Sequence, residues 1–218
     1  MVGGDGFLDD VDAALAEHGV DMWFIDGNHD DHAALAEHRG CSRPVAIRGR
    51  IAYLSRGCGL RLGGLDFGFL GGAFSIDWRD RRIAHDWWPA EIVDRADVAR
   101  IGTASLDVLV AHDAPAGIHF DSGWRLPPDD QMRADETRTL LAEVVAATRP
   151  RLVIHGHWHY AHDTELAWID REATERTGDL TWASTHSPDS AAGQDSRRSA
   201  QTPVVDSSVD ISLTSLRV

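Results

Sequence analysis

Apolar runs that are typical of buried strands alternate along the chain with stretches of helical periodicity. The strand-like runs span residues 21–26, 106–111 and 151–155. In the stretches 7–18 and 32–38, apolar residues recur every three or four positions, which predicts two helices, each followed by a glycine. This alternation predicts an α/β fold.

Residues 45–74 have a different pattern, in which short apolar runs alternate with glycine. The pattern predicts short antiparallel strands, and the Gly-Gly pair at 63–64 marks a hairpin turn. Residues 75–88 are charged and aromatic, which predicts a surface loop. We expect a helix to follow near 89–99, with a proline in its first turn.

A loop and a long helix are predicted between the second and third strand-like runs. Residues 114–129 contain several glycines and prolines, which indicates a loop. Residues 130–148 are expected to form a helix because apolar residues line one face and Pro150 lies just beyond the end. The apolar stripe of this helix consists of Leu140, Leu141, Val144 and Val145.

The length of 218 residues and the pattern predict one domain over residues 1–170. Beyond it, residues 171–218 are expected to form a polar, low-complexity tail. Within the tail, residues 186–202 are rich in Ser, Asp, Gln and Arg, which predicts disorder. Residues 204–218 regain an alternating pattern, which is consistent with a closing strand.

The formal net charge of −14 argues against nucleic acid or an anionic membrane as the main partner. An acidic composition fits a protein that holds cations, but plain solubility is the simpler explanation. The two cysteines, Cys41 and Cys58, do not make a disulfide framework. The N-terminus has no signal-peptide pattern and no apolar run is long enough to span a bilayer, so we expect a cytoplasmic location.

Three histidine-containing motifs follow the three strand-like runs. They are Gly27-Asn28-His29-Asp30, His112-Asp113 and Gly156-His157-Trp158-His159. Residues at the carboxyl ends of strands in an α/β protein point into the crevice at that edge of the sheet. Imidazole and amide groups gathered there from separate segments are what a metal site needs.

Each of these residues also has a simpler explanation. Asn28 suits a turn, His112 suits a structural role at a strand end, and His29 suits an exposed loop. Asp30 is expected either to orient His29 and its loop or to cap the helix that starts near residue 32. The His157–His159 pair is the strongest candidate, because both side chains belong to one turn after a strand.

In their order and context the three motifs resemble the calcineurin-like metallophosphoesterase family, over roughly residues 7–160. The resemblance implies an αββα fold, in which a β-sandwich is flanked by helices. It also implies a hydrolase that uses a dinuclear metal centre on phosphate mono- or diesters. Mixed imidazole and oxygen ligands suit Mn²⁺, Fe or Zn²⁺ better than Mg²⁺ or Ca²⁺.

The resemblance further implies a role for each motif residue. Asn28, His112 and His157 correspond to ligands of the second metal, and His159 corresponds to a ligand of the first. His29, with Asp30 beside it, corresponds to the catalytic residue that faces the phosphate and the leaving-group oxygen. Such a histidine donates a hydrogen bond or a proton to developing negative charge. The implied partner is a phosphorylated small-molecule or macromolecular substrate.

The sequence lacks two further marks of the family, an Asp-x-His pair and a Gly-Asp that carry metal ligands on the first two strands. We therefore expect an N-terminally truncated member that lacks the first strands. Two hypotheses follow for its function. One is a metal-dependent phosphoesterase. The other is a catalytically impaired module that binds a single metal or a phosphorylated ligand.

Overall fold

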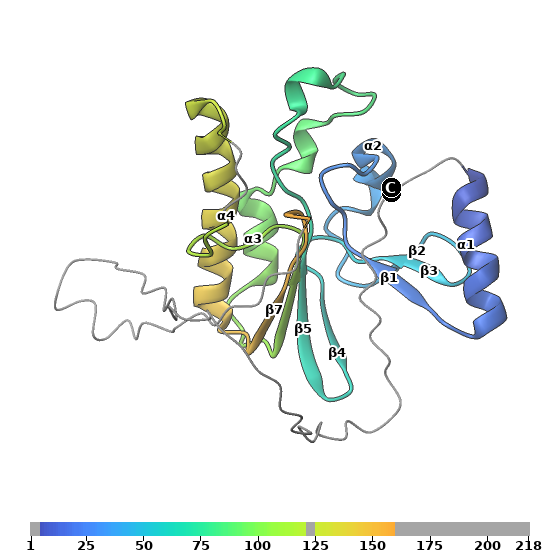
Figure 1. Ribbon diagram of the computed structural model, residues 1–218. Coiled ribbons are helices and arrows are strands. Elements are labelled where there is room, and N and C mark those ends of the chain that lie inside the picture. Colours follow the sequence, from blue (N-terminus) through green and yellow to red (C-terminus); the bar gives the residue numbers. More distant parts are fainter. Residues whose placement is uncertain (1–4, 121–124, 160–218) are drawn as a thin grey trace, which may run out of the picture. The chain divides into compact units, whose positions relative to one another are not determined.

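The computed structural model describes residues 5–120 and 125–159 (Figure 1). The chain divides after Thr164, and all described residues lie in the first of the two units. The predicted tail at 171–218 and its closing strand lie outside the described residues and stay predictions. Among the described residues, no helix is long and apolar enough to cross a membrane.

The smaller of two sheets has three strands in the order β1-β3-β2. Strand β1 (Met22–Phe24) pairs in parallel with β3 (Ile51–Tyr53), and β2 (Val45–Ala46) pairs antiparallel with β3. The antiparallel prediction for residues 45–74 is therefore right for β2 and β3, while the parallel partner of β3 comes from the GNHD strand.

The larger sheet has four strands in the order β4-β5-β6-β7. Strands β4 (Gly59–Leu62) and β5 (Leu65–Leu70) form the predicted hairpin, and both glycines of its turn have positive φ, at 56° and 85°. Strands β6 (Val108–Ala111) and β7 (Leu152–Ile154) then add in parallel to β5. The carboxyl ends of β5, β6 and β7 therefore share one edge.

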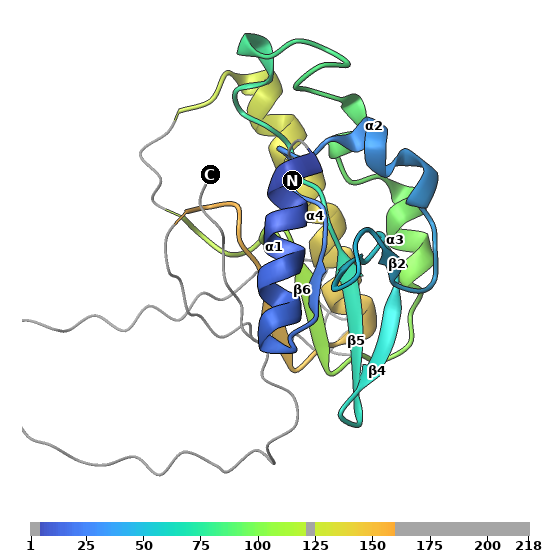
Figure 2. The ribbon, with the colours of Figure 1, turned by 90° about the vertical axis from the view of Figure 1, so that its right-hand side faces the viewer.

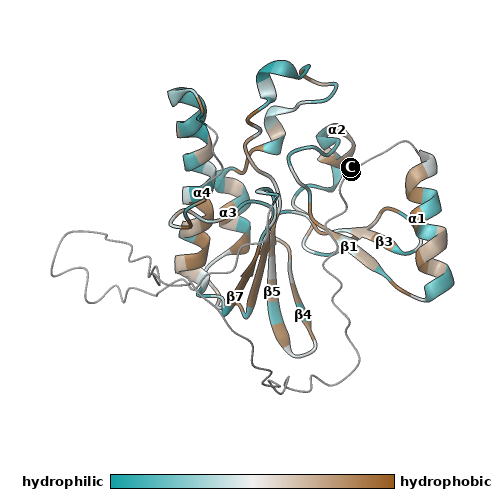
Figure 3. Ribbon diagram, in the orientation of Figure 1, coloured by the Kyte–Doolittle hydropathy of each residue, from teal (hydrophilic) through white to brown (hydrophobic). Residues whose placement is uncertain are grey.

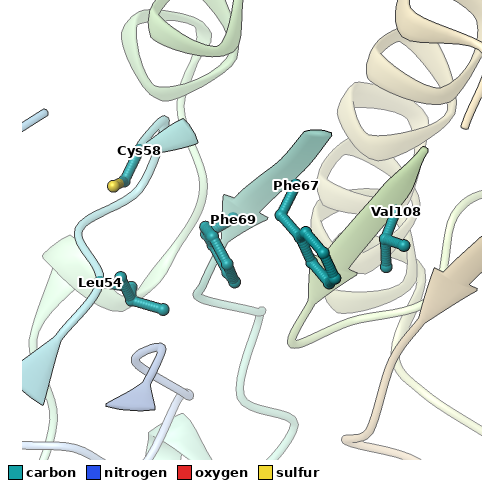
Figure 4. Packing of buried hydrophobic residues seen from close by; sticks show 5 residues of the cluster. All are labelled: Leu54, Cys58, Phe67, Phe69 and Val108. Atoms are coloured by element: carbon teal, nitrogen blue, oxygen red, sulfur yellow. The ribbon is translucent and has the colours of Figure 1, made fainter. Parts of the chain in front are cut away.

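A hydrophobic core packs the larger sheet against the segment that follows β3. It contains Phe67 and Phe69 of β5, Val108 of β6, and Leu54 and Cys58 from the segment after β3 (Figure 4). Alternate residues of a strand face the same side, so the two Phe rings stack with their centroids 6.2 Å apart. Partly buried residues of the larger sheet, and Ile25 just after β1, pack around this cluster; the sheet residues are Leu60, Leu62, Val110 and Ile154.

Helices α3 (Arg95–Ile101) and α4 (Pro128–Thr148) lie side by side next to the larger sheet (Figure 1). Figure 2, seen from the right of Figure 1, has α1 in front and α4 behind. The apolar stripe of α4 is confirmed, since Leu141, Val144 and Val145 are buried. The hydrophobic residues of α4 gather in its C-terminal half, and its N-terminal half is hydrophilic (Figure 3).

The prediction of a helix near 89–99 is wrong in its start. A short 3₁₀ turn, η3 (Pro89–Glu91), contains the proline, and the α-helix begins only at Arg95. The helix starts there because Asp94 and Asp97 form a capping box, in which each side chain accepts from the backbone N–H of the other. A second 3₁₀ turn, η2 (Trp78–Asp80), lies in the preceding loop.

The two N-terminal helices are confirmed. Helix α1 (Asp5–His18) is followed by Gly19 with φ 65°, and α2 (His32–Leu35) continues into the 3₁₀ turn η1 (Ala36–His38). Two mixed sheets and four α-helices among the described residues establish the α/β class. The more specific αββα sandwich stays a prediction.

Candidate functional site

Backbone hydrogen bonds bring the three predicted motifs to one place. Gly72, just after β5, donates to the carbonyl of Asp26 at 2.8 Å, and His112 donates to the carbonyl of Leu70 at 3.1 Å. Gly156 in turn donates to the carbonyl of His112 at 3.0 Å. The end of β5 therefore links the GNHD loop to the ends of β6 and β7.

The closest contact between motifs joins Asn28 and His112. His112 Nε2 lies 3.0 Å from Asn28 Oδ1, within hydrogen-bond distance. The His112 ring packs so closely on Gly27 that a Cβ at residue 27 would lie 2.7 Å from His112 Cε1. Burial, and to a smaller extent His157, lowers the pKa of His112 to about 3, so the ring is neutral at pH 7.

His157 completes this cluster from the third motif. Its ring centroid lies 5.2 Å from that of His112. Burial, with smaller contributions from His159 and Arg138, lowers the pKa of His157, although the Asp113 carboxylate opposes the shift. His157 and His159 both have left-handed backbone, with φ of 67° and 60°, which is uncommon for residues other than glycine. His159 is exposed.

His29 lies at the exposed side of this cluster. Burial and the positive charge of Arg81 lower its pKa, as do His157 and His159, while Asp77 opposes them. His29 is therefore within electrostatic reach of both histidines of the third motif. A neutral, exposed imidazole at this position can donate a hydrogen bond through one ring nitrogen and accept one through the other.

Asp30 holds the backbone of the GNHD loop. Its Oδ2 accepts a hydrogen bond from the N–H of Gly27 at 2.6 Å, and the residue is buried. The alternative that Asp30 caps the following helix is wrong. Asp31 is the cap, because its Oδ1 accepts from the backbone N–H groups of Ala33 and Ala34.

A buried ion pair lies directly before the GNHD loop, and the sequence does not reveal it. Asp26 accepts from Tyr53 Oη at 2.7 Å and from Arg56 Nε at 2.8 Å, and all three residues are at most 1% exposed. Burial alone would raise the pKa of Asp26, but the charge and hydrogen bonds of Arg56 bring it below its ordinary value. Arg56 also contacts Asp97 at 3.2 Å.

The loop predicted at 75–88 also contributes to the site. Ser75 is 1% exposed, and its Oγ lies 2.9 Å from Asn28 Nδ2. Arg81 donates to Ser75 Oγ at 2.8 Å and to the backbone carbonyl of Asn28 at 3.3 Å. The buried carboxylate of Glu91 lies 3.4 Å from Arg81 Nη1. The charged and aromatic composition of residues 75–88 indicates only a surface loop, so this role is not visible in the sequence.

An aromatic stack borders the third motif. Trp158 stacks on Phe120 with centroids 4.1 Å apart, and its Nε1 donates to Asp113 Oδ1 at 3.0 Å. Asp113 also accepts from the N–H of Ala114 at 2.7 Å. Asp113 therefore fixes the position of the Trp158 indole. Because Trp158 directly follows His157, this contact also stabilises the backbone turn at His157.

The residues at the site can be compared with the needs of a divalent metal. Neutral imidazoles and amide oxygens are metal ligands, and two ligands at about 2.1 Å from one metal at a right angle are about 3 Å apart. The Asn28 Oδ1 to His112 Nε2 distance of 3.0 Å has that value. Within residues 5–120 and 125–159, however, no three His, Cys, Asp or Glu side chains are grouped to hold a metal.

The site therefore offers a divalent metal three ligand side chains, which are Asn28, His112 and His157. Neither protein-family models nor curated proteins match this chain.

Proposed function

We propose that the chain is a metal-dependent hydrolase of phosphate mono- or diesters, of the calcineurin-like metallophosphoesterase type with its αββα sandwich, acting in the cytoplasm. The observation that carries the proposal is the approach of Asn28 Oδ1 and His112 Nε2 to 3.0 Å, with the His157 ring 5.2 Å from that of His112. The three side chains come from separate segments that follow β1, β6 and β7.

In this proposal Asn28, His112 and His157 hold a divalent metal such as Mn²⁺, Fe or Zn²⁺, and His159 contributes to a second. Bound metal ions supply charge stabilisation at the phosphoryl oxygens. His29 has a separate task, because its exposed ring can donate a hydrogen bond to the substrate or to the leaving-group oxygen. Asp30 keeps that ring in place through the loop backbone.

The test is hydrolysis of bis(p-nitrophenyl) phosphate by the purified chain with and without Mn²⁺. We expect Mn²⁺-dependent turnover that His157→Ala abolishes. His18→Ala is the matched control, because it removes an exposed imidazole at the end of α1 and should leave turnover unchanged. Turnover that is unaffected by His157→Ala would overturn the proposal.

The second candidate is a module that binds one metal or a phosphorylated ligand without turnover. It is favoured by the small donor set, since no third His, Cys, Asp or Glu joins the two imidazoles in the described part of the chain. This candidate predicts saturable Mn²⁺ binding that His157→Ala weakens, with no hydrolysis at any Mn²⁺ concentration. Any Mn²⁺-dependent turnover would exclude it.

A further inference from the structure

The Ser75 hydroxyl is the centre of a hydrogen-bond network beside Asn28. It lies 2.9 Å from Asn28 Nδ2 and 2.8 Å from Arg81 Nη1. The buried side chain of Glu91 lies next to this network, with its Oε2 3.4 Å from Arg81 Nη1. Ser75 thus has two polar partners, Asn28 and Arg81, although it is 1% exposed.

In the structure the nitrogen of the Asn28 amide faces Ser75, and its oxygen faces His112. A hydroxyl has one hydrogen to donate and two lone pairs that accept. Arg81 and the amide nitrogen of Asn28 can only donate, so each occupies one lone pair of the Ser75 oxygen. The hydrogen bond to Ser75 holds the amide nitrogen on that side, which leaves the amide oxygen for His112.

We propose that Ser75 is a positioning residue that orients the Asn28 amide, so that its oxygen faces His112 and the His112 ring carries its proton on Nε2 in the metal-free protein. The opposite orientation would place the amide N–H₂ group against His112, and a nitrogen bearing two hydrogens is no metal ligand. The consequence for metal binding rests on the proposed function, but the orientation itself does not.

Arg81 anchors this arrangement to the GNHD loop. Its Nη2 donates to the backbone carbonyl of Asn28 at 3.3 Å, while Nη1 donates to Ser75. Its Nε donates to the carbonyl of Asp86 at 2.6 Å, within the same segment of 75–91. The segment therefore holds both the backbone and the side chain of Asn28 through one guanidinium group.

The orientation is tested in the metal-free protein by the nitrogen chemical shifts of the His112 ring, which distinguish the two tautomers. We expect Nε2–H in the unaltered chain and a mixture of tautomers in Ser75→Ala. Ser55→Ala is the matched control, because it removes another fully buried hydroxyl whose partner is the N–H of Gly40. A proton on Nδ1 in the unaltered chain would overturn the inference without any variant.

Metal binding is tested by electron paramagnetic resonance of free Mn²⁺. Loss of one orienting hydrogen bond should weaken Mn²⁺ binding by about three- to tenfold in Ser75→Ala. The same substitution in an Asn28→Asp background should have little effect, because both carboxylate oxygens of Asp can bind a metal. Equal weakening in both backgrounds would mean that Ser75 only supports the fold. An unaltered chain that binds no Mn²⁺ would refute the metal function, while the tautomer measurement would still decide the orientation.

Discussion

His112 Nε2 lies 3.0 Å from Asn28 Oδ1, although 84 positions separate the two residues in the chain. The contact depends on the residue before Asn28. Gly27 leaves room for the His112 ring, which occupies the space where a side chain at this position would begin. The glycine of the GNHD motif therefore has a steric explanation that is independent of any catalytic role.

Gly27→Ala is expected to destabilise the fold by about 1–3 kcal/mol, the usual cost of overpacking a filled site. The added Cβ would meet Cε1 of His112 at 2.7 Å and Nε2 at 3.0 Å, so the ring must move away from Asn28. Urea denaturation measures the loss, and the His112 ring resonances should shift with it.

Gly6→Ala is the control for this substitution. A Cβ at Gly6 meets nothing within 4 Å, and the residue lies in helix α1, where Ala is preferred to Gly by roughly 0.5–1 kcal/mol. The free energy of unfolding should therefore stay constant or rise. If Gly27→Ala behaves like Gly6→Ala, the packing of His112 on Gly27 is not what fixes the loop.

Asp26→Asn is expected to lower the free energy of unfolding by about 3 kcal/mol, because it breaks a buried ion pair and leaves the buried positive charge of Arg56 less well neutralised. The value lies at the low end of the usual range, since Asp97 still faces Arg56 at 3.2 Å. The measurement is again urea denaturation at pH 7.

Arg61→Ala removes an ion pair of similar geometry at the surface. Arg61 and Asp66 are 2.9 Å apart, but their side chains are 67% and 45% exposed, so the loss should not exceed about 1 kcal/mol. Comparable losses in the two variants would show that burial does not set the strength of the Asp26–Arg56 pair.

Much of this fold follows from local patterns. The amphipathic face of α4 and the Gly-Gly turn between β4 and β5 are short-range features, and the structure contains both. The prediction of a site at strand ends also used a general rule of parallel sheets. In the structure His112 contacts Asn28, and its ring lies next to that of His157.

The residues that sequence reasoning missed act through long-range contacts. Nothing local to Ser75 indicates that it faces Asn28, 47 positions away. Arg56 follows an apolar strand in a Ser-Arg-Gly stretch that resembles an ordinary turn, yet it is fully buried against Asp26. The start of α3 was misplaced because Pro89 is a common first residue of helices, while the Asp94–Asp97 capping box fixed the actual start.

The buried ring of His32 predicts a loss of stability in acid. Its pKa is lowered from 6.5 to about 4, mainly by burial and also by Arg56, although Asp26 and the carbonyl of Gly27 oppose the shift. Between these two values the unfolded chain binds a proton that the folded chain does not, so the free energy of unfolding falls as pH falls from 6.5 to about 4.

His32→Gln should flatten this part of the pH profile, because Gln does not titrate and can still donate to the carbonyl of Gly27. In the unaltered chain, His32 should lower the free energy of unfolding by about 3 kcal/mol between pH 6.5 and about 4. The pKa of His112 is also lowered, so the free energy of unfolding of the variant should still decrease as the pH falls. Urea denaturation at several pH values gives both profiles, and a ring titration by NMR locates the His32 pKa. A titration of His32 near 6.5 in the folded protein, or parallel profiles for the two chains, would contradict the prediction.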